Sequence, residues 1–376
     1  MLVIFFTNIG ARVKRIVILL LGLAILFGGN CTKNPTGPGG VRGPILYAIT
    51  SQFSLNRTLI LFIDTTTDSL VDSMAVPYGA AWGWGASPDG STLYLLSMGR
   101  GGAGGGVEID TRTKTVKYAG PLTGRPTPDG KFLICSDSKS LKVIDAKRRK
   151  VLFEDSIPMI VQGTGWPFDP LRGLVYAAYL EPGATVATKI GVFDYRKLKL
   201  LKIIDPAEIG GYGVAVNDLV LTNDGNKLYY TASFGLLTGI DLRKERVITL
   251  LGLNALSWLG ITPDDRYLYL TDPGGGIIPP SPTGKIGVYS PDYEKPLESI
   301  DVCQQTDLCL VPVPTNQIAI SASGKKAYVT SSDMSGCSVL LVIDTRHNLI
   351  RELIRIPQDI CGIGSLAVQP PSTFRF

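Results

Sequence analysis

The sequence predicts an all-β fold, a seven-bladed β-propeller of four-stranded antiparallel blades, on three observations. The first is composition: 45% of residues are hydrophobic, 18% are charged, and 43 Gly and 25 Pro favour short strands and tight turns. The second is a recurring segment, "ASPDGSTLYLL" at Ala86–Leu96, which returns as "TPDGKFLIC" from Thr127 and "TPDDRYLYL" from Thr262. The third is a second recurring turn, marked by an Asp at the end of a hydrophobic strand.

The first turn of each repeat follows an apolar strand and has the pattern Pro-Asp-Gly or a variant of it. Pro presets φ, Asp bonds the backbone two residues on, and Gly accepts a positive φ, so this tripeptide reverses the chain. The turn falls at Pro88, Pro128, Pro170, Asn223, Pro263 and Ala322. An alternating strand follows it in each copy, and a variable loop comes next.

The second turn gives the number of repeats. Its markers are Asp64, Asp110, Asp145, Asp194, Asp241, Ser290 and Asp344, which makes seven copies. The missing first turn is supplied from the C-terminus, where "GSLAVQPPS" (Gly364–Ser372) ends at the same point of the unit. The repeats therefore begin at the second strand of one unit, from Pro44, and the C-terminal strand joins this N-terminal blade to close a ring.

Four short strands per repeat make a sheet with two apolar faces, which no single repeat can bury. Packing seven sheets around an axis buries these faces between neighbours and leaves only short protected edges. The repeat spacing of about 40 to 60 residues is that of propeller blades, whereas solenoid repeats span about 20 to 34.

The repeats also resemble a known family. The segments "SPDGSTLYLLS…VEIDTRTKTV", "TPDGKFLICSD…LKVIDAKRRKVL" and "SASGKKAYVTSS…LLVIDTRHNLI" are similar to the YVTN-type β-propeller repeat, and "AYVTSS" from Ala327 is the nearest match to its namesake. The resemblance covers about residues 44 to 372. It implies a WD40-like propeller and, for function, a binding protein. Blade 4 ("FDPLRGLVYAAY") and blade 6, with an insert at Pro273–Lys285, depart most from the pattern.

The N-terminal segment lies outside the repeats. Basic residues, the first of them Arg12, precede the apolar run Ile16–Phe27. As a helix this run would span roughly 18 Å, too short for a bilayer core of about 30 Å. The pattern predicts a signal peptide over residues 1–30.

Small residues before a cysteine, followed by a flexible segment, resemble a bacterial lipoprotein signal. We therefore expect lipidation of Cys31, a flexible Pro/Gly tether over residues 31–43 and the propeller over residues 44–376. Gly28 and Asn30 depart from the usual lipoprotein pattern, so secretion without a lipid, an uncleaved anchor and a later translation start stay open.

The expected location is extracytoplasmic: the cell envelope, lipid-anchored at an outer membrane or in a periplasm, or secreted. Thr32, rather than Asp, after the cysteine favours an outer membrane, by resemblance to lipoprotein sorting. Further cysteines fit an oxidising compartment. Cys303, Cys309, Cys337 and Cys361 are the disulfide candidates, and the sequence leaves their three possible pairings open.

Few residue patterns support catalysis or metal binding. The one histidine, His347, lies in an outer turn, which argues against histidine-based catalysis and against haem or copper ligation. No Cys-x-x-Cys pair supports zinc, and Cys135 is expected to be a buried thiol outside any disulfide. The tract Gly99–Gly106 lacks the Lys and Ser or Thr of a phosphate-binding loop. We predict no catalytic residues, no metal ligands and no cofactor.

Calcium is the one cation left open, because it needs only oxygen ligands. The acidic residues in or beside loops on one side of the ring are Asp205, Glu208, Asp272, Asp301, Asp307 and Asp333. No Asp-x-Asp-x-Asp spacing gathers them, so scattered surface acids are the simpler interpretation.

Aromatic residues supply the candidate ligand contacts. Trp84 and Trp166 occupy equivalent positions on innermost strands, where other blades have Leu or Ile, and we expect them in the core. Trp82 and Trp258 lie earlier on such strands, nearer the channel mouth, where an aromatic ring can stack on a ligand. Together with Tyr212 they are the ligand-binding candidates, with core packing as the alternative for the tryptophans.

Basic residues cluster in the second turns of three successive blades. They are Lys147, Arg148, Arg149, Lys150, Arg196, Lys197, Arg243 and Lys244. Because successive blades are neighbours, these turns form a basic arc on one face, which is either a solvated surface or a contact for anionic lipid head groups. The net charge of +5 is too modest for this length to predict a nucleic-acid partner.

The opposite face carries loops of varying length. They are Ser51–Arg57, Gly99–Gly106, Leu180–Lys189, Pro273–Lys285, Ser331–Ser338 and the segment "CQQTDLC". Binding residues concentrate on loops held by a scaffold, so this is the expected recognition face, with neutral drift of exposed loops as the other interpretation. We expect a monomeric, non-catalytic protein that binds a protein, peptide or glycan of the cell envelope. The alternative is a hydrolase or lyase that uses carboxylates and tyrosines at the channel mouth, with or without Ca²⁺.

If the basic arc contacts membranes, raising the salt concentration should abolish binding of the protein to anionic vesicles. The screening length falls from about 8 Å at 0.15 M salt to about 3 Å at 1 M, which weakens exposed charge pairs. Co-sedimentation with anionic and with neutral vesicles measures this, and retention on anionic vesicles at 1 M salt would contradict it.

Overall fold

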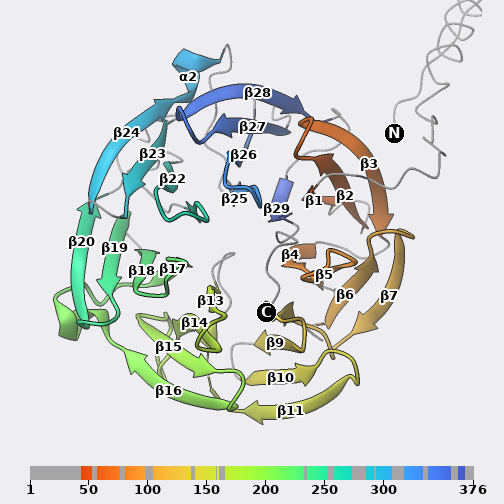
Figure 1. Ribbon diagram of the computed structural model, residues 1–376. Helices are drawn as coiled ribbons and strands as arrows, with labels where there is room; N and C mark the ends of the chain where they lie inside the picture. The colour runs from red at the N-terminus through yellow and green to blue at the C-terminus, as the bar shows by residue number, and fades with distance from the viewer. Residues whose placement is uncertain are drawn as a thin grey trace, which may run out of the picture. The chain divides into compact units, whose positions relative to one another are not determined.

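Seven antiparallel sheets follow one another around a ring (Figure 1). The computed structural model describes residues 44–52, 57–76, 81–97, 105–136, 140–157, 159–160, 166–232, 235–252, 258–272, 285–291, 294–306, 317–332, 338–356 and 363–368. All of them belong to one of the chain's two units, Gly43–Phe376. None of the described helices is long and apolar enough to cross a bilayer.

Each sheet is one blade, numbered by its place along the chain. Blade 1 contains β29 (Ile363–Val368), β1 (Ile45–Gln52), β2 (Arg57–Asp64) and β3 (Ser69–Val76). Blade 2 contains β4 (Ala81–Ala86), β5 (Thr92–Ser97), β6 (Gly105–Asp110) and β7 (Thr115–Gly120). Blade 3 contains β8 (Arg125–Pro126), β9 (Phe132–Ser136), β10 (Leu141–Asp145) and β11 (Lys150–Asp155). Blade 4 contains β12 (Met159–Ile160), β13 (Phe168–Asp169), β14 (Leu174–Tyr179), β15 (Lys189–Asp194) and β16 (Lys199–Ile204).

The remaining blades have the same order. Blade 5 contains β17 (Val216–Leu221), β18 (Lys227–Ala232), β19 (Leu236–Asp241) and β20 (Arg246–Gly252). Blade 6 contains β21 (Leu259–Ile261), β22 (Leu268–Asp272), β23 (Lys285–Ser290) and β24 (Lys295–Asp301). Blade 7 contains β25 (Ile318–Ile320), β26 (Lys326–Ser332), β27 (Ser338–Asp344) and β28 (Leu349–Arg355). Two short helices, η2 (Pro206–Ile209) and α2 (Val302–Gln305), follow blades 4 and 6.

The ring closes as the sequence predicts. The C-terminal strand β29 pairs antiparallel with β1, with Leu46 opposite Val368 and Tyr47 opposite Ala367, so blade 1 contains both ends of the repeat region. The first strand of each blade lies nearest the axis and the last lies at the rim (Figure 1). In blade 4 the innermost position is shared by β12 and β13, which both pair with β14. The predicted fold class, including the strand that closes the ring, is confirmed.

In blades 2, 3, 5 and 6 the first turn is built by a Ser or Thr and by the Asp two residues later. Blade 7 has Ser321 and Ser323 at these positions, and the turn of blade 4 begins with Asp169, which binds Arg172. In blade 3, the Thr127 hydroxyl donates to Asp129 Oδ1 at 2.7 Å, and the Gly130 amide donates to the Thr127 carbonyl at 2.8 Å. Gly130 then takes a φ of 68°, which favours glycine because it has no Cβ. In blade 6, Asp265 fills this position at a φ of 59°.

The second turn depends on its marker carboxylate. In blade 3, Asp145 Oδ1 accepts hydrogen bonds from the amides of Lys147 and Arg148 at 3.0 and 2.7 Å. The next residue of the turn is left-handed in all seven blades, at φ values from 48° to 56°, and it is never Gly. These left-handed residues are Asp68, Lys114, Arg149, Leu198, Glu245, Glu294 and Asn348.

Each rim strand carries a one-residue irregularity at the same register. In blade 3, Ile144 pairs with Val151 and Val143 pairs with Phe153, so Leu152 is skipped. The same shift occurs in the other six blades. A bulge increases the local twist, and at a rim it makes the free strand edge a poorer template for another chain.

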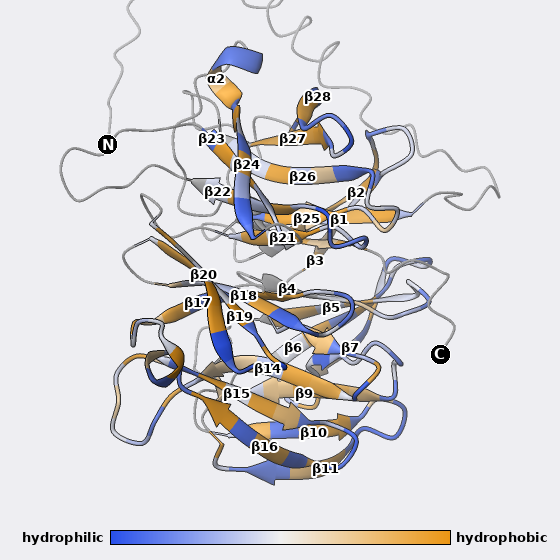
Figure 2. Cartoon of the chain, turned by 60° about the vertical axis from the view of Figure 1, so that its left-hand side comes forward, coloured by the Kyte–Doolittle hydropathy of each residue, from blue (hydrophilic) through white to orange (hydrophobic). Residues whose placement is uncertain are grey.

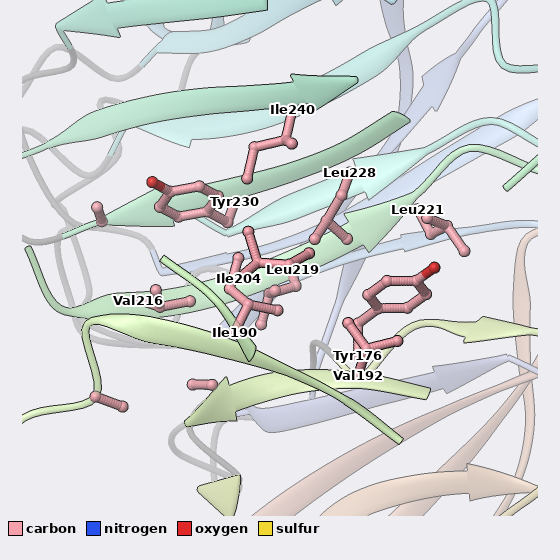
Figure 3. Packing of buried hydrophobic residues seen from close by; sticks show 13 residues of the cluster. Tyr176, Ile190, Val192, Ile204, Val216, Leu219, Leu221, Leu228, Tyr230 and Ile240 are labelled. Carbon is pink, nitrogen blue, oxygen red and sulfur yellow. The ribbon is translucent and has the colours of Figure 1, made fainter. Parts of the chain in front are cut away.

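The core lies between the blades. One cluster of buried hydrophobic side chains fills each junction, and strands carry most of the hydrophobic residues while the rim turns are largely hydrophilic (Figure 2). Figure 3 shows the junction of blades 4 and 5, where Tyr176 and Val192 face Leu219, Leu228 and Ile240. Neither blade could bury these side chains alone, so stability depends on the closed ring.

The left-handed residues connect the blades at the rim, because each reaches back to the preceding blade. The contacts are Asp68 with Lys326 and Tyr328, Lys114 with Asp72, Arg149 with Glu108, Glu245 with Lys202, Glu294 with Lys227, and Asn348 with Glu298 and Tyr269. Leu198 packs instead into the hydrophobic cluster between blades 3 and 4. Every junction therefore has an apolar cluster and a contact from the same turn position.

Replacing Arg149 by Met should lower the free energy of unfolding by about 3 kcal/mol, because Glu108 is 1% exposed and would keep a buried, unpaired charge. Arg148→Met is the matched control: this neighbouring cation is exposed, and its loss should change stability by less than about 0.5 kcal/mol. Adding Glu108→Leu to Arg149→Met should recover part of the loss. Urea unfolding measures all three, and equal losses for the two Arg variants would contradict this role of Arg149.

Candidate functional site

The strand order gives the ring two unlike faces. The first and second turns of every blade lie on one side, which we call the turn face. The loops between second and third strands, and the connections to the next blade, lie on the other side, the loop face. Of the predicted variable loops, residues 53–56, 98–104, 273–284 and 333–337 lie outside the described residues. The loop Leu180–Lys189 and the connection from β16 to β17 are described in full.

These two segments, residues 180–188 and 205–215, form the blade 4 loop pair. Lys189 Nζ binds Glu181 at 2.7 Å in the first segment and Asp205 at 3.0 Å in the second. The hydrogen bonds to Glu181 and Asp205 raise the pKa of Lys189, so it stays charged. Asp205 also caps η2 by accepting from the Ala207 amide at 2.9 Å. One cation thus holds both segments together.

The loop pair is also anchored in the core below it. Ala187 is buried in the cluster between blades 4 and 5, and Leu180, Ile209 and Val214 pack against that cluster. The Val216 amide donates to the Ala187 carbonyl at 2.8 Å, which joins the two segments by a backbone bond. This anchoring gives the loop pair a fixed shape.

Two hydrophobic side chains of the loop pair face solvent. Val186 is 50% exposed and Tyr212, one of the predicted ligand contacts, is 52% exposed. Leu171 is the comparable exposed residue of blade 4 on the turn face, at 74%. The sequence analysis identified Tyr212 but not Val186. The feature that could have identified Val186 was its position within the long loop Leu180–Lys189.

The tryptophans are placed differently. Trp166 is 2% exposed and belongs to the core, as predicted. Trp258 is half-buried, and its backbone amide donates to Thr271 Oγ1 at 3.0 Å. The side chains of Trp82 and Trp84 lie outside the described residues, so their roles stay predictions.

A central cavity of about 380 Å³ lies where the innermost strands converge. Residues from all seven blades line it, and among the described lining residues Arg125 is the one that is charged. Its guanidinium lies 5.6 Å from the centre of the Phe168 ring. Desolvation lowers the pKa of Arg125 to about 10, against the opposing attraction of Asp218, so it is still protonated at neutral pH.

Arg125 was missed by the sequence analysis, although the repeats carry its signal. It lies two residues before Thr127, at the end of the innermost strand. Other blades have small or apolar residues at that position, namely Gly85, Pro167, Val220, Gly260, Ala319 and Ala367. A position-by-position alignment of the repeats would have revealed the one cation.

The predicted basic arc lies on the turn face but presents less free charge than the sequence suggests. Arg148, Lys197 and Lys244 pair with the marker Asp of their own turn at 3.0, 3.4 and 3.8 Å. Arg149 is in a blade junction, and Arg196 donates to the Pro170 carbonyl at 2.6 Å. The other members are Lys147, Lys150 and Arg243; the first two are exposed, and Arg243 donates from Nε to Asn226.

The described carboxylates with shifted pKa values have structural roles. The pKa values of Asp110, Asp145 and Asp241 are lowered, chiefly because turn amides donate to them. Lys202 lowers the pKa of Glu245. The groups with raised pKa values are buried tyrosines and paired cations: Tyr47, Tyr94 and Tyr176 reach about 12, mainly by desolvation inside the blades.

Metal and thiol chemistry finds little support among the described residues. They contain no group of three or more His, Cys, Asp or Glu that could hold a metal ion. His347 lies on an exposed turn with Nδ1 3.1 Å from Asp344. Cys135 is half-buried and outside any disulfide, and Cys303, in α2, is a free thiol. Cys31, Cys309, Cys337 and Cys361 lie outside the described residues, so lipidation and disulfide pairing stay predictions.

Comparison with solved structures supports the architecture. A functionally unknown protein from Desulfotomaculum acetoxidans is similar at a TM-score of 0.62 and 16% identity, over 86% of this chain and 99% of that one. A chain of the mitotic checkpoint complex gives 0.56 and 13%, over 75% and 81%. Dihydro-haem d1 dehydrogenase NirN, in complex with DHE, gives 0.54 and 13%, over 88% and 76%. These identities show the fold alone.

No protein-family model and no curated protein matches the chain. The chain is a seven-bladed β-propeller, with a WD40-like fold and structural neighbours that include both an enzyme and a member of a protein complex. Membership of the YVTN-type repeat family stays a prediction.

The lowered carboxylate pKa values predict acid sensitivity. A carboxylate whose pKa is depressed by folding contributes stability above its ordinary pKa, and that contribution is lost as pH falls through the folded value. The free energy of unfolding should therefore decrease as pH falls below about 4. Asp241→Asn keeps an acceptor for the turn amides and should flatten this decrease relative to wild type. Urea unfolding between pH 5 and 2.5 measures it, and identical slopes would contradict the role of the turn.

Proposed function

We propose that this propeller is a non-catalytic, extracytoplasmic binding protein that recognises a protein, peptide or glycan of the cell envelope through its loop face. The observation that carries the proposal is the blade 4 loop pair, which exposes Val186 and Tyr212 on segments fixed to the core. A tyrosine offers an amphipathic ring with few rotatable bonds, which suits it to a contact surface. Because the loops are ordered before binding, less conformational entropy is lost on association.

The electrostatics favours binding over catalysis. A hydrolase or lyase at the channel mouth would need carboxylates with pKa values tuned toward neutrality. The described carboxylates with shifted values are instead lowered and engaged in turns and blade contacts. Among the described residues around the central cavity, the charged lining group is a cation, Arg125. This arrangement supports a binding role.

The N-terminal sequence supports a tethered location. We propose that Cys31 carries the lipid and that residues 31–43 separate the ring from a membrane. The turn face would then meet anionic head groups through its exposed cations, including Lys147 and Lys150. The loop face would stay available to a partner.

The double variant Val186→Ser/Tyr212→Ala should weaken capture of an envelope partner by about tenfold or more, because central aromatic contacts contribute most to such interfaces. Leu171→Ser is the matched control: it removes a hydrophobic side chain of higher exposure from the turn face of the same blade. The measurement is cross-linking and affinity capture from the source cell envelope, followed by affinity titration of the captured partner.

A further bait with Pro273–Lys285 replaced by a short turn tests the rest of the loop face. Loss of the partner with either loop-face variant, and retention with Leu171→Ser, is the expected result. Equal capture by all baits would contradict recognition through this face, and no captured protein or glycan with any bait would contradict the binding role itself.

A further inference from the structure

A second hollow, of about 480 Å³, lies on the turn face and is lined by residues of blades 6, 7 and 1. The first turn of blade 6, both turns of blade 7 and Asp68 of blade 1 contribute to it. Its described lining residues include five cations and three aspartates, so positive charge is in excess. The cations are Arg266, Lys325, Lys326, Arg346 and Arg351.

The first turns of blades 6 and 7 bring two of these cations together. Arg266 and Lys325 occupy the same place in their blades, directly after the left-handed residue of the turn. The two turns are in contact, because a Cβ added to Gly324 would lie 2.9 Å from Pro263 Cδ. Equivalent positions in two touching turns therefore present two cations to one hollow.

The second turn of blade 7 adds Arg346. The neighbouring Thr345 hydroxyl donates to the Gly324 carbonyl at 2.6 Å, and the Thr345 amide donates to the Lys325 carbonyl at 3.1 Å. These bonds fix the second turn against the first. All three cations thus come from turns whose backbones are held in place before any ligand binds.

The aspartates of the hollow are engaged in contacts with the protein. The contacts are Asp68 with Lys326 at 2.6 Å, Asp264 with the Thr262 hydroxyl at 2.6 Å and the Arg266 amide at 3.2 Å, and Asp344 with the Arg346 amide at 2.9 Å, His347 Nδ1 at 3.1 Å and Arg351 Nε at 3.6 Å. The side chains of Arg266, Lys325 and Arg346 are exposed and have no carboxylate partner among the residues that the structure describes.

From this juxtaposition we propose that the hollow binds the phosphate group of a phosphate monoester. Such a group carries a charge of about −1.5 to −2 at pH 7 and three acceptor oxygens, so it can accept from several cations at once. A carboxylate has two oxygens and suits a single arginine. Arg266 lies 5.4 Å from the centre of the Tyr267 ring, which also lines the hollow and restricts the guanidinium.

The ester can belong to a soluble molecule or to a lipid head group, because both present the same phosphate chemistry. The volume lies within the range of small-molecule sites, about 300 to 1,000 Å³, and leaves room for a polar body beside the phosphate. This site lies on the turn face, and it does not depend on the proposed recognition of an envelope partner through the loop face.

Isothermal titration calorimetry of the purified protein at low salt tests the site. Glycerol 3-phosphate should bind saturably with one site per chain. Glycerate, a three-carbon acid with a carboxylate in place of the phosphate, should bind at least about tenfold more weakly, and glycerol should not bind. Absence of saturable glycerol 3-phosphate binding, or equal affinity for glycerate, would overturn the proposal.

Vesicles distinguish the two sources of the ester. Phosphatidic acid presents the glycerol 3-phosphate group at a membrane surface, so the probe is phosphatidylcholine vesicles with and without phosphatidic acid. Binding to phosphatidic acid vesicles that excess glycerol 3-phosphate abolishes would support a lipid head group in the hollow. Saturable binding of glycerol 3-phosphate that leaves vesicle binding unchanged would support a soluble ester and assign any membrane contact to the basic arc.

Variants locate the binding. Arg266→Gln and Lys325→Gln should each weaken glycerol 3-phosphate binding by about fivefold, and the double variant by about tenfold or more. Arg112→Gln is the matched control, because this exposed arginine holds in blade 2 the turn position that Arg346 holds in blade 7, and it does not line the hollow. Its affinity should stay that of wild type.

All of these side chains are exposed, so the variants should fold. Unchanged affinity in the double variant would place the ligand elsewhere and overturn the assignment. An equal loss in Arg112→Gln and Arg266→Gln would reveal attraction to the net charge alone, which would also overturn it.

Discussion

The structure depends on one repeated contact at the rim. In the second turn of each blade, a non-glycine residue takes a left-handed φ, which is unfavourable by about 1 kcal/mol. The side chain of this residue contacts the preceding blade. The marker Asp stabilises this backbone by accepting turn amides, as Asp145 does ahead of Arg149. The chemistry of the contact varies among ion pairs, a hydrogen bond to Tyr269 and the packing of Leu198, while its position stays fixed. The position and the left-handed backbone of this residue are therefore the same in all seven blades, whereas the chemistry of its side-chain contact differs.

This arrangement separates the contacts that stabilise the ring from the loops that vary in length. The turns, the rim contacts and the hydrophobic clusters define the ring from one face and from its interior. The loop face carries the connections whose lengths vary among the repeats, and loops held by a scaffold can change without rebuilding it. The blade 4 loop pair shows how such a loop still becomes ordered: Lys189 joins its two segments, and Ala187 extends the core beneath them.

The fold could be predicted because its signals are local and repeated: a Pro-Asp-Gly turn or a marker Asp acts within a few residues and recurs along the chain. Side-chain roles were harder to predict. Arg148 and Arg149 look alike in sequence, yet one left-handed φ directs Arg149 into the junction with Glu108, while Arg148 stays at the surface. Arg125 acquires its surroundings from Phe168 and Asp218, on other blades, so its environment exists only once the ring has closed.

Ring closure also explains why the axis is the place where the repeats can differ. Seven innermost strands converge there. Gly260 relieves the crowding, because a Cβ at this position would lie 2.5 Å from Ile318 Cγ2. An identical residue in every blade would give a symmetric, uniformly apolar channel. Blades 3 to 5 break this symmetry, since Arg125 replaces a small or apolar residue and Asp218 supplies the balancing charge. The attraction of Asp218 opposes the desolvation of Arg125, so this sector keeps a cation at the axis, whereas the other described residues that line the central cavity are uncharged.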